Sequence, residues 1–82
     1  MKATVLIRPK EGILDPQGEA VGDALRTLGF AVSGARVGRL VDVQLDTDDA
    51  AEARMALARM SNELLANPLI ESFTIEVESA HE

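Results

Sequence analysis

The sequence contains no cysteine, tyrosine or tryptophan, and it has only one histidine and two phenylalanines among its 82 residues. Without cysteine there can be no disulfide, thiolate metal site or cysteine nucleophile. The scarcity of aromatic side chains removes the stacking platforms that RNA-binding and single-strand-binding sheets use. The apolar run near the N-terminus ends at Arg8 and Pro9, too short for a signal peptide or a membrane span. We therefore expect a cytoplasmic protein.

The charge balance is acidic, with 14 aspartates and glutamates against 8 lysines and arginines, and a formal net charge of −6. Such a field repels phosphate backbones and anionic membrane surfaces, so neither nucleic acid nor membrane is expected as a partner. A chain of this length forms a single domain, over residues 1–82, and buries only about 60 to 65% of the surface that its unfolded form exposes. We expect modest stability and a frayed tail at residues 79–82.

Hydrophobic periodicity predicts the element order β-α-β-β-α-β. Apolar residues alternate with polar ones in four segments, of which the second is the weakest: residues 2–8, 32–37, 41–46 and 69–77. Between them, a three-and-four spacing predicts one helix that begins at Asp15 and is capped by Gly29, and a second that follows Thr47 or Asp48 as its cap and ends at Asn67 and Pro68. Gly38 suggests a hairpin turn or bulge that joins the second and third strands.

This order is typical of a ferredoxin-like α+β sandwich, a four-stranded antiparallel sheet with two helices on one face. We expect one face of the second helix to fill the core together with Met55; its residues are Ala53, Leu57, Met60, Leu64 and Leu65. The uncovered sheet face would carry Leu6, Leu40 and Ile70 among polar residues. That face is too apolar for an ideal solvent surface, so self-association is expected.

The side chains available for catalysis are few. His81 is the second-last residue, and a mobile end cannot preorganise a site. No Ser-His-Asp arrangement is visible, and the carboxylates at residues 46–49 and on the last strand fit helix capping and an exposed strand face better than a metal site. Arg36 and Arg39 flank Gly38 and could form a fork for phosphate or carboxylate, although ordinary turn-flanking charges explain them as well. Contact with a partner protein is the favoured functional use.

The stretch LDPQG predicts a well-built helix start. Asp15 is expected to cap free amides and Pro16 to take the first helical position. Gly18 is not explained by capping, because a glycine there costs up to about 1 kcal/mol relative to alanine. We expect another backbone or a partner side chain to lie close to it, and Gly18→Leu to leave the fold intact but weaken assembly.

Three separated motifs resemble the PurS family, the small subunit of bacterial and archaeal phosphoribosylformylglycinamidine synthase. The family's L-D-P-x-G helix start corresponds to residues 14–18, and its V-R-x-G-K turn to residues 35–39, with Arg39 in place of the usual lysine. Its L-L-A-N-P-x-I-E stretch, with a later valine, corresponds to residues 64–71 and Val77. The resemblance extends from the first strand to Glu78.

The resemblance implies a role in de novo purine synthesis, where ATP drives conversion of formylglycinamide ribonucleotide to the amidine with nitrogen from glutamine. In that family a large PurL subunit binds ATP, magnesium and the ribonucleotide, and a PurQ glutaminase releases ammonia. PurS joins them as a strand-exchanged dimer and assists ammonia transfer. The chain would then be a non-catalytic assembly subunit of an ATP-dependent, glutamine-hydrolysing ligase, with no cofactor or metal of its own. The matched motif residues would form its partner interface: Asp15, Pro16, Gly18, Arg36, Gly38, Arg39, Asn67 and Pro68.

Two other classes of function remain open at this point. A regulatory module of the ACT kind shares the β-α-β-β-α-β order and binds small effectors at dimer interfaces, so it predicts thermal stabilisation by amino acids or nucleotides. A small stand-alone ferredoxin-like enzyme would need an acid or base in an enclosed pocket, and the sequence offers no candidate for it.

Overall fold

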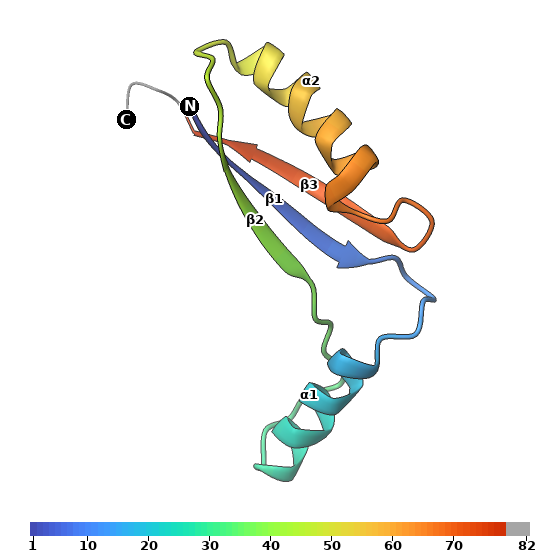
Figure 1. The fold of residues 1–82 in the computed structure, drawn as a ribbon. Helices are drawn as coiled ribbons and strands as arrows, with labels where there is room; N and C mark the ends of the chain where they lie inside the picture. The colour runs from blue at the N-terminus through green and yellow to red at the C-terminus, as the bar shows by residue number, and fades with distance from the viewer. Residues whose placement is uncertain (79–82) are drawn as a thin grey trace.

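The computed structural model describes residues 1–78 as a three-stranded antiparallel sheet with one helix packed on it and another helix beyond its end (Figure 1). In chain order the elements are β1 (Lys2–Pro9), α1 (Pro16–Thr27), β2 (Arg39–Gln44), α2 (Ala50–Met60), the π-helical turn η1 (Ser61–Leu65) and β3 (Glu71–Val77). β1 lies in the middle of the sheet, between β2 and β3. The tail expected to fray at 79–82, with His81, lies outside the described residues.

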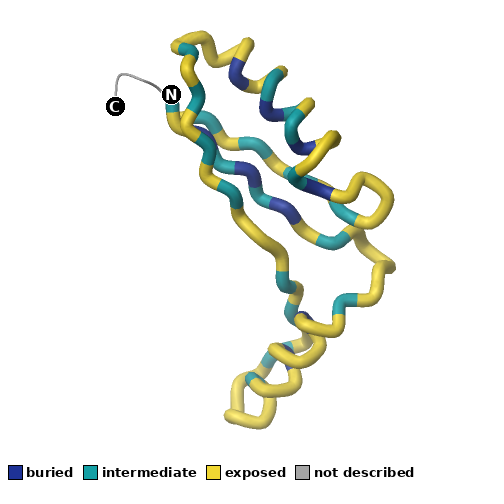
Figure 2. The backbone as a smooth tube through the Cα atoms, viewed as in Figure 1, coloured by how far each residue is buried: buried dark blue, intermediate teal, exposed yellow. Residues whose placement is uncertain are grey.

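The core lies between α2 and the face of the sheet that β1 fills with every second residue. Ala3, Val5 and Ile7 are almost fully buried there against Leu57 of α2 (Figure 2). β2 and β3 contribute half-buried residues in register with them, and Val5, for example, pairs with Val41 on one side and Ile75 on the other. Period-two alternation therefore predicts the buried face of all three strands.

No other part of residues 1–78 covers the opposite face of the sheet (Figure 1). Leu6 and Leu40 are cross-strand partners on it, as expected from the sequence, among polar residues such as Thr4 and Asp42. Ile70 is exposed but lies in the turn before β3, not in the sheet.

The predicted strand at 32–37 and its hairpin are wrong: these residues form no strand, and the sheet that residues 1–78 form has three strands, not four. Val37 donates its N–H to the Asp15 carboxylate at 3.0 Å, and the Val32 carbonyl accepts from Arg26 at 3.0 Å, so this segment is bound to the ends of α1. Gly38 lies so close to β1 that an added Cβ would collide with the carbonyl oxygen of Ile7. The glycine allows this close approach of two backbones and makes no hairpin turn.

The expectation that both helices cover one sheet face is also wrong, because α1 extends past the end of the sheet (Figure 1). Its apolar stripe is uncovered, and Leu28 at its end is 73% exposed. The radius of gyration is 15.9 Å, whereas a compact chain of this length is expected to have about 12 Å. The segment after β1 continues outward from the sheet into α1, which leaves the stripe without a partner among residues 1–78 (Figure 1).

The second helix differs from the prediction in three respects: its N-terminal cap and the exposure of two of its apolar side chains. Asp49 is the cap, accepting from the N–H groups of Ala51 and Glu52, whereas Thr47 or Asp48 was expected. Met55 is 72% exposed, because it lies two residues from both buried positions of α2 and so on the opposite side of the helix. The remaining difference, at Leu64, arises in η1.

Leu64 is 83% exposed, although seven residues after Leu57 it would share that residue's face on a regular α-helix. In η1 the Ala66 N–H donates to the Ser61 carbonyl at 2.9 Å, which adds one residue to the turn. Ser61 is buried because it lies four residues after Leu57, on the same face of a regular helix. The extra residue rotates the side chains that follow, so that Ala66 is buried and Leu64 is not.

Candidate functional site

The start of α1 is held by one carboxylate that binds two distant parts of the backbone. Asp15 accepts from the Gly18 N–H through Oδ1 and from the Val37 N–H through Oδ2, both at 3.0 Å. Pro16 takes the first helical position, so the predicted cap is confirmed. The backbone hydrogen bonds from Gly18 and Val37 lower the pKa of Asp15. The cap therefore also anchors the segment that returns to the sheet.

Gly18 is buried because the chain's own backbone comes close to it. An added Cβ would lie 2.5 Å from the carbonyl oxygen of Ala35 and would also collide with the Asp15 carboxylate. The expectation of a second backbone near this glycine is confirmed, since that backbone is the returning segment. The structure contradicts the expectation that Gly18→Leu would leave the fold intact.

Arg39 joins β2 to β3 across the end of β1. Its guanidinium donates to both carboxylate oxygens of Glu71, at 2.7 and 3.0 Å, and to the carbonyl of Leu65 at 2.7 Å. The hydrogen bond from Arg39 lowers the pKa of Glu71, and that from Glu71 raises the pKa of Arg39. A lysine, usual here in the resembling family, could not form the same two-pronged pair.

Asn67 and Pro68 form the turn that leads from η1 into β3. The Asn67 N–H donates to Glu71 Oε1 at 2.7 Å, its carbonyl accepts from the Glu71 N–H at 2.7 Å, and its Oδ1 accepts from the Leu69 N–H at 3.1 Å. No residue other than glycine has a positive φ within residues 1–78, so Asn67 ends the helical segment without the left-handed conformation that asparagine tolerates. Through Glu71 this turn and Arg39 belong to one hydrogen-bonded network.

Three motif residues, Arg36, Gly38 and Arg39, line a shallow depression of about 250 Å³ where the sheet meets the segment that runs from α1 to β2. The depression is lined by residues of β1, β2 and that segment: Leu6, Ile7, Arg8, Arg36, Gly38, Arg39 and Leu40. Arg8 belongs to none of the three motifs. Its position in β1, two residues after Leu6 and therefore on the same face, is the signal that could have placed it there.

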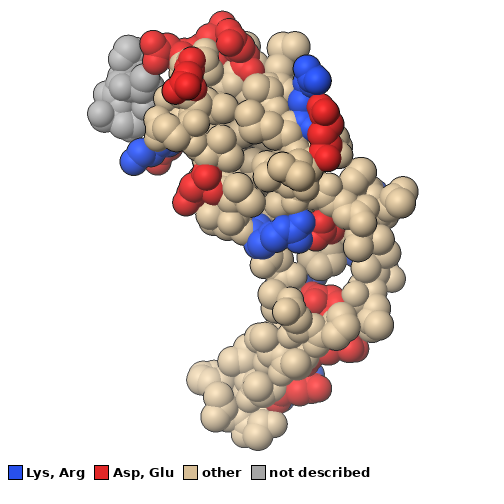
Figure 3. Space-filling view, viewed as in Figure 1, with Lys and Arg blue, Asp and Glu red and all other residues tan. Residues whose placement is uncertain are grey.

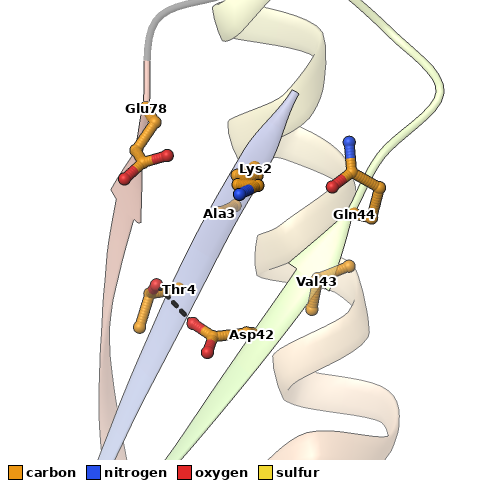
Figure 4. A pocket seen from close by; sticks show the side chains of 7 residues that line it. All are labelled: Lys2, Ala3, Thr4, Asp42, Val43, Gln44 and Glu78. Carbon is orange, nitrogen blue, oxygen red and sulfur yellow. Dashed lines mark hydrogen bonds between the residues drawn. The ribbon is translucent and has the colours of Figure 1, made fainter. Parts of the chain in front are cut away.

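A second hollow, of about 400 Å³, lies at the other end of the uncovered sheet face. Figure 4 shows Lys2, Thr4 and Asp42 there, with α2 behind the sheet and Thr4 Oγ1 donating to Asp42 at 2.8 Å. Within residues 1–78, no three histidine, aspartate or glutamate side chains lie close enough to hold a metal ion. None of the helices of this part of the chain is long and apolar enough to cross a membrane. The motif side chains Asp15, Arg39 and Asn67 hold backbone in place.

Fold and site together define a small ferredoxin-like α+β protein whose motif residues fix the course of its own backbone. Residues 2–79 match the family described as PurS: Phosphoribosylformylglycinamidine (FGAM) synthase. The chain belongs to the PurS family, and the ACT-like alternative is not favoured.

Known PurS proteins resemble this chain both in sequence and in structure. The PurS subunit of this synthase from Archaeoglobus fulgidus is 40% identical over 76 residues, which cover 92% of this chain and 95% of the relative. The one from Mycobacterium leprae is 40% identical over 80 residues, covering 95% and 96%. The crystal structure of Methanocaldococcus jannaschii PurS superposes with a TM-score of 0.84 at 34% identity, covering 95% of each chain. That protein is described as a subunit of formylglycinamide ribonucleotide amidotransferase in the purine biosynthetic pathway.

Proposed function

We propose that this chain is the assembly subunit of FGAM synthase in purine biosynthesis and holds the PurQ glutaminase beside the PurL synthetase during ammonia transfer. The observation that carries the proposal is the match to PurS over residues 2–79. The contacts support it, because the motif residues Asp15 and Arg39 stabilise a scaffold and are hydrogen-bonded within it. ATP, magnesium and ribonucleotide would be bound by the large subunit, and the enzyme as a whole would work in the cytoplasm.

An adaptor can control flux without doing chemistry. Ammonia released into bulk water is protonated and diluted, and the protonated form is not a nucleophile. Two active sites held in fixed register behave as if the intermediate were present at high local concentration. The chain would therefore raise the yield of product per glutamine consumed.

We infer that the working form contains at least two copies of this chain. Its accessible surface is 5936 Å², whereas a compact monomer of 8.8 kDa is expected to expose about 4,800 Å². The excess of about 1,100 Å² exceeds the roughly 800 Å² that each partner buries in a standard interface. The apolar stripe of α1, with Val21 and Leu28 exposed, would supply much of this contact, and exchange of segments between copies would cover it.

The proposed partner-facing region follows the three motifs. It comprises the start of α1, the segment before β2 and the turn before β3: Asp15, Pro16, Gly18, Arg36, Gly38, Arg39, Asn67 and Pro68. All of these except Asp15 and Gly18 are exposed. The two exceptions would act indirectly, by fixing the backbone that presents their neighbours.

Reconstitution tests the proposal. The chain is mixed with PurL and PurQ, glutamine, ATP, magnesium and ribonucleotide, and the mass of the assembly and the rate of product formation are measured. We expect a complex containing all three proteins and a glutamine-dependent rate that rises with the amount of this chain. Equal rates without it would refute the proposal.

A further inference from the structure

The depression between the sheet and the segment that runs from α1 to β2 has features of a binding surface. Two exposed arginines line it: Arg8 at the end of β1 and Arg36 just before β2. Leu6 and Leu40, the cross-strand pair of the uncovered sheet face, give it an apolar floor. Arginines beside an apolar floor are typical of protein interfaces.

Neither arginine of the depression forms an ion pair within the described residues. Within residues 1–78 the ion pairs are Arg26–Asp23, Arg39–Glu71 and Arg59–Glu63. Arg36 is near the Asp15 carboxylate, but that carboxylate already accepts two backbone hydrogen bonds. The guanidinium groups of Arg8 and Arg36 thus leave planar, two-pronged donors at one place on a chain whose net charge is −6.

We propose that this depression receives a carboxylate side chain from an acidic segment of a synthase partner subunit, an inference that rests on the proposed function. Arg8 and Arg36 would bind the carboxylate, while Leu6 and Leu40 contact its methylene groups or an aliphatic neighbour. Arg39 also lines the depression, but its guanidinium is already bound to Glu71, so Arg8 and Arg36 are the donors left for this carboxylate.

The distribution of charge gives the docking a direction. The two arginines lie where β1 ends and β2 begins, whereas the acidic run Asp46, Asp48 and Asp49 follows the other end of β2. Figure 3 shows acidic side chains gathered at the end of the molecule where α2 starts. An acidic partner segment would be repelled from that end and attracted to the arginines, which fixes its orientation.

The test compares Arg8→Gln and Arg36→Gln with Arg54→Gln as the matched control. Arg54 is also an exposed arginine without an ion pair in the described part of the chain, but it lies on α2 outside the depression. Dissociation constants for the complex with PurL and PurQ are measured at low and high salt. Each test variant should bind about tenfold more weakly at low salt, with a smaller difference at high salt, and Arg54→Gln should bind like the unchanged protein.

Three further readouts distinguish the alternatives. Equal affinity for both test variants and the control overturns the proposal while leaving the proposed function intact, whereas failure of the unchanged chain to bind overturns both. Thermal stabilisation of the unchanged chain, but not of Arg8→Gln, by millimolar inorganic phosphate would identify a phosphate site in its place. A lower homo-oligomer mass for Arg36→Gln would assign the depression to a second copy of this chain.

Arg8→Lys, which keeps the charge, should restore part of the affinity if a carboxylate is bound.

Discussion

Replacing Leu28 at the end of α1 by serine tests whether a second copy of the chain buries the apolar stripe of α1. In the single chain Leu28 is 73% exposed, so the substitution should change the free energy of unfolding of an isolated protomer by no more than about 0.5 kcal/mol. If a second copy buries this side chain, about 1.5 to 3 kcal/mol is lost per chain. A symmetric dimer contains the site twice, so the loss is roughly 3 to 6 kcal/mol, or a hundred- to ten-thousandfold rise in its dissociation constant.

Sedimentation equilibrium over a range of protein concentrations measures this constant. Leu64→Ser is the control, because that leucine is 83% exposed but lies in η1, away from α1. Leu28→Ser should shift the chain towards monomer while the control stays associated. A Leu28→Ser protein with unchanged association would refute the assignment of the α1 stripe to a dimer interface.

Three further predictions concern the single chain, and thermal unfolding checks each of them. Gly38→Ala should destabilise by about 1 to 3 kcal/mol, because the new Cβ collides with a carbonyl oxygen of β1, whereas Gly34→Ala, which meets open space, should lower the midpoint by nothing measurable. Leu57→Ala should cost about 2 to 5 kcal/mol because its side chain is fully buried, and Leu64→Ala less than about 0.5 kcal/mol; similar losses for both would contradict the π-helical turn. Glu71→Gln should lower the midpoint at neutral pH, and the difference from the unchanged protein should disappear as the pH falls below the ordinary pKa of 4.5 and through the lowered pKa of the folded state. A difference that persists or grows in acid would contradict the ion pair with Arg39.

Local features of the fold were predictable because the residues that cause them are neighbours in sequence. Asp15 caps α1 as expected, and the Gly29 end of the helix has the two hydrogen bonds of a Schellman motif, from Gly29 to Arg26 and from Phe30 to Leu25. The alternation in β1 likewise predicted which of its residues are buried.

Features that depend on distant parts of the chain were not predictable in the same way. The residues at 32–37 have a strand-like pattern, but a pattern does not say whether a neighbouring strand is available to pair with it. The apolar stripe of α1 shows that something covers the helix and not which chain does so. Leu64 was misassigned because one extra residue in η1 rotates the helix face, and no simple pattern reports such a turn.

In the candidate site, too, the sequence motifs predicted individual residues, whereas the contacts between distant residues required the structure. The motifs at 36–39 and 64–71 drew attention to Arg39 and Asn67, and only the fold showed that Glu71 joins them in one network. Arg8 and Arg36 line one depression because antiparallel pairing brings the end of β1 beside the start of β2. Each residue by itself reads as an ordinary surface charge.

The central claim is that this chain couples a glutaminase to a synthetase without taking part in either reaction. The most direct measurement compares the rate of amidine formation with glutamine and with an ammonium salt as nitrogen source, each in the presence and absence of this chain. The account predicts that omitting the chain abolishes most of the glutamine-dependent rate and leaves the ammonium-dependent rate of the synthetase unchanged. A glutamine-dependent rate that is the same with and without the chain would contradict it.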